Sequence, residues 1–187
     1  MVTASNVITL PRQESRSFGR RDLIPLWPDA LWKIERGVVR TLTWSENGTL
    51  ISLGYWSTGE VVGQPLTCLD PYQIECLTPV SVHLIPSQQW PQELNAIFSY
   101  AQQVQELHSI VQIQGTDQRL LNFLSWLAKK FGQVTEAGQL IDLRLTHLEI
   151  SDVIGTTRVS VTRMMRRLEA QGIILRPTRH AIVLRRL

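Results

Sequence analysis

The chain has 187 residues, of which 43% are hydrophobic and 19% are charged, and its net charge is +3. This is enough apolar material for one or two packed domains, which argues against wholesale disorder. No stretch approaches the roughly 18 consecutive apolar residues of a membrane helix, no signal peptide is recognisable at the N-terminus, and two cysteines are too few for a disulfide framework or a four-thiolate cluster. We therefore expect a cytoplasmic protein with no membrane partner.

Positive charge is concentrated in the last quarter of the sequence. Residues 139–187 hold nine arginines against four carboxylates, a net charge of +5, whereas residues 1–138 hold ten basic and twelve acidic residues, a net charge of −2. Such asymmetry favours an anionic partner for the C-terminal part, nucleic acid first. On charge alone, a solvated basic face is the simpler explanation.

The N-terminal half has the pattern of a short polar segment followed by strands. Residues 1–22 are predicted to form a mobile arm or a loose first element. Between residues 23 and 88, short segments of alternating hydrophobicity are separated by turn residues, which predicts an antiparallel β-roll. Asn47-Gly48 is a strong hairpin signal, because both central residues of a type I′ turn need positive φ.

The hydrophobic period changes to that of a helix after Ser87. We predict a long helix over residues 89–114 with apolar residues at heptad spacing and one polar position, His108. Phe98, Leu107 and Ile110 broaden this apolar face. Packing within one chain is possible, but the length of the seam favours a homodimer. The expected dimer interface consists of Leu94, Ile97, Ala101, Val104, His108 and Val111.

Residues 115–187 carry the most informative pattern, that of two short helices and a hairpin. Thr146 and Glu149 have the spacing of a capping box, which predicts a helix over about 147–154. Gly155 permits a tight turn, Thr157 can cap a second helix over about 158–171, and two strand-like segments surround Pro177-Thr178. Together these features predict a winged helix-turn-helix and, with the roll and the long helix, an α+β fold.

The second of these helices has a basic outer face, and its N-terminus offers free amides that favour a phosphate. Arginine matches the O6 and N7 acceptors of guanine, the commonest specific contact in the major groove. The alternative is an amphipathic helical hairpin whose arginines are merely solvated. The candidate DNA-binding residues are Thr146, Thr157, Arg158, Val159, Ser160, Thr162, Arg163, Arg166, Arg167, Arg179 and His180.

The order of roll, long helix and winged helix-turn-helix resembles the Crp/Fnr superfamily of bacterial transcription regulators. The run Gly155-Thr-Thr-Arg-Val-Ser-Val-Thr-Arg163 is similar to the recognition helix of the cyanobacterial global nitrogen regulator branch. The resemblance implies that Arg158 and Arg163 contact bases of duplex DNA. Val159 stands where the cyclic-AMP receptor type has a glutamate, so a GTA…TAC-like palindrome is expected rather than TGTGA…TCACA.

The resemblance also raises the question of an effector, and the roll looks shortened relative to the family. Cyclic-nucleotide-binding members have a Gly-Glu-Leu segment and an Arg-Ser pair, where this chain has Gly63-Gln64-Pro65 and residues 69–73 without a cation. A buried phosphate without a countercharge would be costly. The 2-oxoglutarate-binding branch uses an arginine on the long helix, and residues 102–114 contain neither Arg nor Lys.

Other cofactors are also disfavoured by the sequence. His83 or His108 could ligate a haem, but a lone histidine is more often an ordinary core or surface residue; Cys68 and Cys76 could oxidise together, but are more often small hydrophobes. We therefore expect no cofactor and no effector, with the roll serving dimerisation or contact with another protein such as RNA polymerase. An effector-gated regulator responding to a metabolite or a redox signal, and a protein-interaction module with an idle basic face, remain open. An enzyme is not expected, because no nucleophile elbow, metal-ligand cluster or phosphate-binding loop is present.

Overall fold

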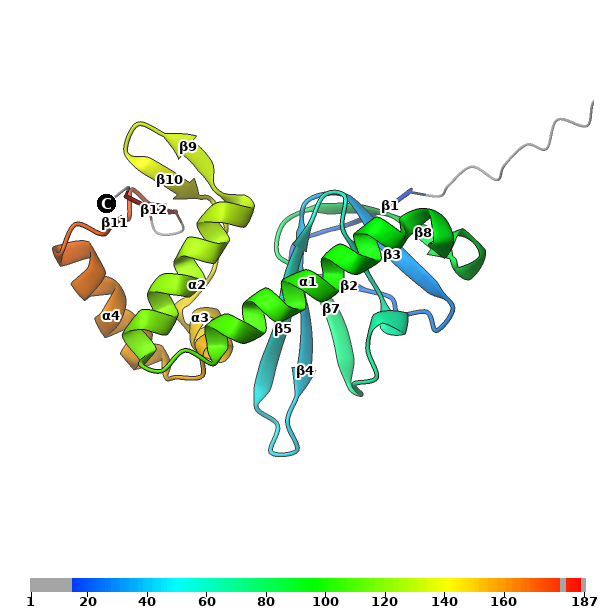
Figure 1. Ribbon diagram of the computed structural model, residues 1–187, viewed down its shortest axis with the longest axis horizontal. Coiled ribbons are helices and arrows are strands. Elements are labelled where there is room, and N and C mark those ends of the chain that lie inside the picture. The colour runs from blue at the N-terminus through cyan, green and yellow to red at the C-terminus, as the bar shows by residue number, and fades with distance from the viewer. Residues whose placement is uncertain (1–14, 179–180, 186–187) are drawn as a thin grey trace, which may run out of the picture.

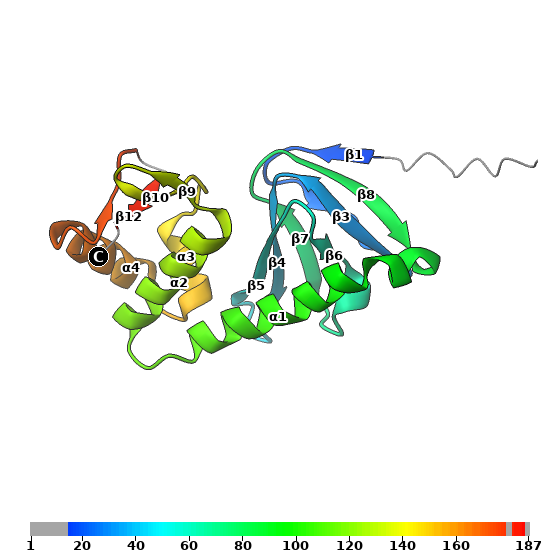
Figure 2. The ribbon, with the colours of Figure 1, turned by 45° about the horizontal axis from the view of Figure 1, so that its top comes forward.

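A long helix, α1 (Leu94–Val111), connects a sheet-rich N-terminal unit to a mainly helical C-terminal unit (Figure 1). The structure is a computed structural model that describes residues 15–178 and 181–185. In a second view, α1 runs along the roll and continues to the C-terminal unit (Figure 2). This arrangement confirms the predicted α+β fold with its roll, long helix and C-terminal helix-turn-helix.

The N-terminal unit is a roll of two antiparallel four-stranded sheets, with strand orders β1-β8-β3-β6 and β2-β7-β4-β5. Its strands are β1 (Ser15–Phe18), β2 (Leu23–Ile24), β3 (Ala30–Arg36), β4 (Val38–Trp44), β5 (Leu50–Ser57), β6 (Val61–Val62), β7 (Tyr72–Cys76) and β8 (Val80–Pro86). Side chains of both sheets share one core, which includes the buried rings of Trp32, Trp56 and Tyr72. Aromatic residues therefore fill the space between the two sheets.

The structure refines two local predictions for the roll. Residues 1–22 were predicted to form a mobile arm or a loose first element, and Ser15–Phe18 of this segment forms β1, which pairs with β8 from Ser15↔His83 to Phe18↔Val80. Residues 1–14 lie outside the described residues. The hairpin predicted at Asn47-Gly48 is confirmed by the pairing of β4 with β5, but its turn is not of type I′, because Asn47 has negative φ and only Gly48 is left-handed, with φ +77°. The amide of Gly48 donates to the carbonyl of Ser45 at 2.8 Å, which makes the loop one residue longer than a two-residue turn.

The long helix begins later than predicted. Residues Ser87–Glu93 form a 3-10 helix that contains Pro91, and α1 then runs over Leu94–Val111 instead of residues 89–114. Pro91 has no amide hydrogen and fits the irregular entry better than the interior of an α-helix. Leu107 and Ile110 are buried in the chain's own core, so one side of α1 is already covered.

The C-terminal unit packs three helices against a small sheet of order β11-β12-β10-β9. Its elements are α2 (Thr116–Phe131), β9 (Gln133–Thr135), β10 (Gly138–Ile141), α3 (His147–Ile154), α4 (Arg158–Ala170), β11 (Ile174–Leu175) and β12 (Ile182–Leu184). The two helices of the predicted helix-turn-helix are confirmed within one residue at their ends. β9 and β10 form an antiparallel hairpin that pairs from Gly138↔Thr135 to Leu140↔Gln133.

Candidate nucleic-acid interface

The helix pair α3–α4 is held by caps that its sequence specifies. The hydroxyl of Thr146 accepts from the amide of Glu149 at 3.1 Å, and Oε2 of Glu149 accepts from the amide of Thr146 at 2.6 Å, which completes the predicted capping box. Gly155 ends α3 with φ +63°, and the hydroxyl of Thr157 accepts from the amide of Ser160 at 3.1 Å to begin α4. The turn is therefore fixed by local hydrogen bonds.

Helix α4 has one apolar and one basic side. Val161, Met164 and Met165 are buried in the core. On the opposite side Val159 is 77% exposed, and the face also carries exposed arginines. An open hollow on this outer face is lined by Arg158, Val159, Thr162, Arg163 and Arg166. The sequence-predicted base-contacting residues thus come together on one accessible surface.

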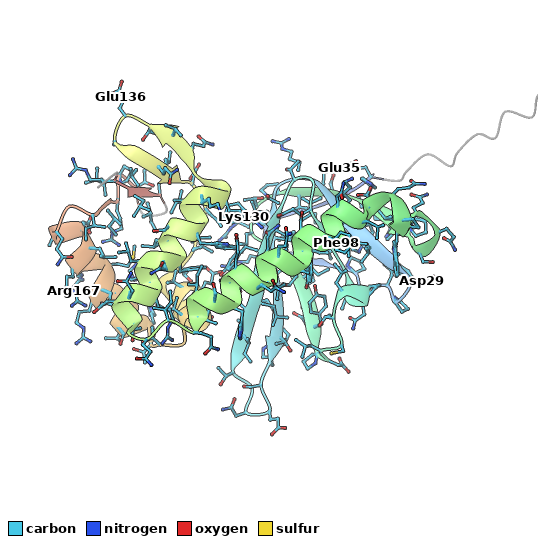
Figure 3. The ribbon with its side chains drawn as sticks, viewed as in Figure 1. Asp29, Glu35, Phe98, Lys130, Glu136 and Arg167 are labelled. Carbon is cyan, nitrogen blue, oxygen red and sulfur yellow. The ribbon has the colours of Figure 1, made fainter. Side chains whose placement is uncertain are left out.

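The arginines on this surface differ in how they are engaged. Arg158, Arg163 and Arg166 make no ion pair with any of the described residues, so their charges face solvent. Arg167 is different, because its guanidinium contacts the carboxylate of Asp117 on α2 at 2.5 Å. Figure 3 labels Arg167 at the outer side of α4. A field from three unpaired cations and the amino end of α4 is therefore directed outward.

The other candidate DNA-binding residues lie at the ends of the helices or outside the described residues. Thr146 and Thr157 are exposed helix caps, so their hydroxyls already accept intrachain hydrogen bonds. Ser160 is half-buried and lies within 3.0 Å of Thr157 through the two hydroxyl oxygens. Arg179 and His180, expected at the tip of the wing, lie outside the described residues.

His147, the first residue of α3, was not among the candidate residues predicted from the sequence. Its Nδ1 lies 2.8 Å from the hydroxyl oxygen of Thr162, so it connects α3 to α4. Burial, together with the positive charges of Arg176, Arg158 and Arg166, lowers the pKa of His147. The ring also lines a cavity beside Arg144 and Arg176. The imidazole therefore stands among cations, at the edge of the basic face of α4.

The candidate dimer seam is only partly accessible. Leu94 is 48% exposed and Val104 36% exposed, and Ala101 and His108 are also exposed. Ile97 and Val111 are half-buried against the chain's own cores. Phe98, at 61% exposed, is the most accessible large apolar residue of α1 (Figure 3). The uncovered face is therefore rotated toward Phe98 relative to the predicted seam.

The described residues offer little for a redox or metal site. They contain no group of three or more His, Cys, Asp or Glu side chains that could hold a metal ion. Cys68 is exposed, whereas Cys76 is buried and burial raises its pKa to about 12, which disfavours a thiolate pair. Nδ1 of His83 lies 3.1 Å from Glu35. No helix in the described part is long and apolar enough to cross a membrane.

Comparison with known proteins agrees with this geometry. Residues 118–187 match the model of the Crp-like helix-turn-helix domain. The chain is 39% identical over 170 residues to the regulatory protein CysR of Synechococcus elongatus, covering 88% of this chain and 81% of that protein. It is also 43% identical over 56 residues to the global nitrogen regulator of the same organism, covering 30% of this chain and 25% of that protein.

Solved structures share the whole architecture. The transcriptional regulator TTHB099 of Thermus thermophilus superimposes with a TM-score of 0.78 at 22% identity, covering 92% of both chains. FixK2 of Bradyrhizobium japonicum gives a TM-score of 0.76 at 19% identity, again covering 92% of both chains. With the extended match to CysR and the Crp-like helix-turn-helix, these likenesses establish that the chain belongs to the Crp/Fnr family of transcription regulators.

Proposed function

We propose that this family member is a homodimeric, sequence-specific DNA-binding regulator that reads a GTA…TAC-like palindrome and needs no cyclic nucleotide. The observation that carries the proposal is the exposed face of α4, where Val159 lies among Arg158, Arg163 and Arg166, three cations without ion-pair partners among the described residues. A protein-interaction module would have no use for three unpaired cations around an exposed valine. Family members regulate transcription, so DNA binding takes precedence over an enzymatic role.

Base recognition would rest on guanidinium and methyl groups. Arg158 and Arg163 can each form two parallel hydrogen bonds to the O6 and N7 acceptors of a guanine. Val159 has no acceptor for a cytosine amino group, but its methyl groups can pack on a thymine methyl. This combination supports a GTA…TAC-like site over TGTGA…TCACA, and the free amides of α4 supply a phosphate contact.

Dimerisation would use the uncovered face of α1. Leu94, Phe98 and Ala101 are exposed there at helical spacing, and burying them against a second copy would remove apolar surface from water. A two-fold dimer presents its recognition helices roughly 34–36 Å apart, one turn of the duplex. The tip of the β4–β5 hairpin projects away from α1 (Figure 1) and would remain accessible to a protein partner such as RNA polymerase.

Independence from cyclic nucleotide is supported by what fills the space between the roll and α1. The ring of Trp56 stacks on that of Tyr100, with 4.2 Å between centroids and 13° between planes. Tyr100 is packed against the core of the roll, and Tyr72 is buried in that core. An aromatic stack in this position takes up space between the roll and α1, and the nearby Nζ of Lys130 is already paired with Glu60 at 2.9 Å, which supports binding to DNA without an effector.

Replacing Arg158 tests base recognition. Arg158→Ala should lose about 1–3 kcal/mol of discrimination between a GTA…TAC duplex and a scrambled duplex, because alanine cannot pair with guanine. Fluorescence anisotropy at several salt concentrations measures both affinities. Arg36→Ala, which removes an exposed arginine at the end of β3 in the roll, is the matched control. Equal weakening on both duplexes would reduce Arg158 to a phosphate contact, and selection of TGTGA half-sites from random DNA would contradict the proposed operator.

Replacing Phe98 tests the dimer. Phe98→Glu should weaken self-association at least about tenfold, because a carboxylate would be forced into an apolar seam. Sedimentation equilibrium measures the dissociation constant. Val134→Glu provides the control, since Val134 is 72% exposed on β9, away from α1. Unchanged self-association in Phe98→Glu would place the interface elsewhere.

DNA binding should take up a proton at His147. In the free protein burial and neighbouring arginines lower the pKa of His147; phosphates that neutralise those arginines would raise it, so affinity should increase as the pH falls from about 8 to about 6. His147→Asn should remove this part of the pH dependence. His83→Asn, which changes a histidine of β8 in the roll, should not. Parallel pH profiles of wild type and His147→Asn would disprove proton uptake at this residue.

Cyclic AMP should leave operator affinity and thermal stability unchanged, because the aromatic stack fills the space that it would need. Titration of the protein–operator complex and thermal-shift assays with saturating nucleotide measure both quantities. A screen of metabolites in the same assays addresses gating by another ligand. A ligand that raises the melting temperature and the operator affinity together would replace the effector-free model.

A further inference from the structure

The roll and the helix-turn-helix are joined by more than the α1–α2 connection. Tyr55 of β5 and Leu77, which follows β7, belong to the same buried cluster as the core of the C-terminal unit. The ring of Tyr55 lies 5.9 Å from that of Phe123 and 6.3 Å from that of Trp126, both on α2. Apolar contacts of this kind hold two units together but tolerate sliding, because they have no preferred direction.

A group of four charged side chains at this interface makes contacts that, unlike apolar ones, require one relative orientation of the two units. Nη1 of Arg21 lies 2.7 Å from Oε1 of Glu75, and Nη2 of the same guanidinium lies 2.7 Å from Oε1 of Glu149. Nε of Arg40 lies 2.6 Å from Oε2 of Glu75, and its Nη2 lies 3.5 Å from Oε1 of Glu149. We call these four residues the interdomain quartet. Three come from the roll, and Glu149 comes from α3.

The quartet is electrically balanced and largely buried. Two guanidinium groups face two carboxylates, and Arg40, Glu75 and Glu149 are 5%, 8% and 4% exposed. Burial alone would raise the pKa of Glu149, but the amide of Thr146 and the guanidinium of Arg40 lower it overall, so this carboxylate is ionised. A buried ion pair loses most when one member is displaced, because the other is left unpaired. The quartet therefore penalises movement of α3 relative to the roll.

The backbone at Arg21 points to the same role. Arg21 is the one non-glycine residue in the described part of the chain with positive φ, at +76°. This conformation is unfavourable for a side chain with a Cβ and persists only where the surroundings fix it. The amide of Arg21 donates to the carbonyl of Cys76 at 2.7 Å, which holds the residue beside β7 with its guanidinium between Glu75 and Glu149.

A second attachment joins the two units at α2. Nζ of Lys130 lies 2.9 Å from Oε1 of Glu60, the residue before β6, and 5.0 Å from the ring centroid of Trp56 on β5. Figure 3 shows Lys130 at the end of α2 that faces the roll. Nε2 of Gln103 on α1 donates to the same Glu60 carboxylate. One ionic attachment would allow the C-terminal unit to rotate about it. Two attachments, one on α3 and one on α2, resist that rotation.

We propose that the interdomain quartet is a positioning device that fixes the orientation of the helix-turn-helix relative to the roll. Arg21, Arg40, Glu75 and Glu149 are then positioning residues, which act on DNA through α3 and α4. Resting on the proposed function, the consequence for DNA is that the quartet sets the separation and angle of the two recognition helices. Changing the spacer of a palindrome by one base pair rotates one half-site by roughly 35°, which a rigidly positioned pair cannot follow.

The double variant Arg21→Met/Glu149→Gln removes the charges that pair between the two units. It keeps the capping box of α3 and the Arg40–Glu75 pair of the roll. Glutamine at the third helical position still completes a capping box. The pair Arg40–Glu75 stays balanced within the roll. Lys129→Met/Glu106→Gln is the matched control, because it removes one cation and one carboxylate from an exposed pair between α2 and α1. Lys130→Met/Glu60→Gln removes the second attachment and should act in the same direction.

The first measurement needs no DNA. Spin labels are placed at Glu46→Cys, on the tip of β4–β5, and at Gln171→Cys, after α4, in a Cys68→Ser background; Cys76 is buried and stays unlabelled. Labelled protein is diluted with unlabelled protein so that distances within one chain are recorded. The distance distribution should broaden in Arg21→Met/Glu149→Gln and remain narrow in the control. An unchanged distribution in the quartet variant would overturn the proposal.

The second measurement uses a series of GTA…TAC duplexes with different spacers. Wild-type affinity should fall about tenfold or more when the spacer changes by one base pair, and by less than about threefold in the quartet variant. Affinity for a duplex with a single half-site should stay equal, which a merely destabilised helix-turn-helix would not allow. Equal spacer selectivity in both proteins would refute the positioning role. If the wild type bound no duplex, only the proposed function would be contradicted. The spin-label distances would still test whether the quartet fixes the orientation of the helix-turn-helix.

Discussion

One carboxylate, that of Glu149, connects the local order of the helix-turn-helix to the rest of the chain. Its Oε2 accepts from the amide of Thr146 and starts α3, while its Oε1 lies 2.7 Å from the guanidinium of Arg21 in the roll. A buried charge needs partners on every side, because water is not there to solvate it. The first turn of α3 and the docking of the C-terminal unit therefore depend on the same ionised group.

The direction in which the basic face of α4 points depends on how α3 and α4 are held against the rest of the chain. Val161, Met164 and Met165 bury the inner side of α4, so its arginines have no alternative to solvent or an anion. Electrostatic attraction to phosphates would bring any duplex to this face, whereas the selection of a sequence needs two such faces held at a set distance. The roll, whose Trp56 stacks on Tyr100 of α1, carries Arg21, Arg40 and Glu75, which hold Glu149 of α3 in place.

Local signals allowed the helix-turn-helix to be predicted almost to the residue, because Thr146, Gly155 and Thr157 act on atoms within a few positions of themselves. Long-range pairing left no such signal. Arg21 lies in a segment that looked like a polar arm, and its partners are 54 and 128 positions further along the chain. The heptad pattern of α1 predicted an apolar face but not its direction, because Ile97 and Val111 were taken up by the chain's own cores while Phe98 was left outside.

The hydrogen bond between His147 and Thr162 limits the hydrogen bonds that Thr162 of α4 can make to another molecule. The single hydroxyl hydrogen of Thr162 has two intrachain acceptors within reach, the carbonyl of Arg158 at 2.9 Å and the imidazole at 2.8 Å. Toward a base edge, this side chain has only lone pairs and a methyl group left. In the proposed complex, Thr162 would therefore accept hydrogen bonds from a base or contact a thymine methyl group, and the donors to guanine acceptors would come first from Arg158 and Arg163.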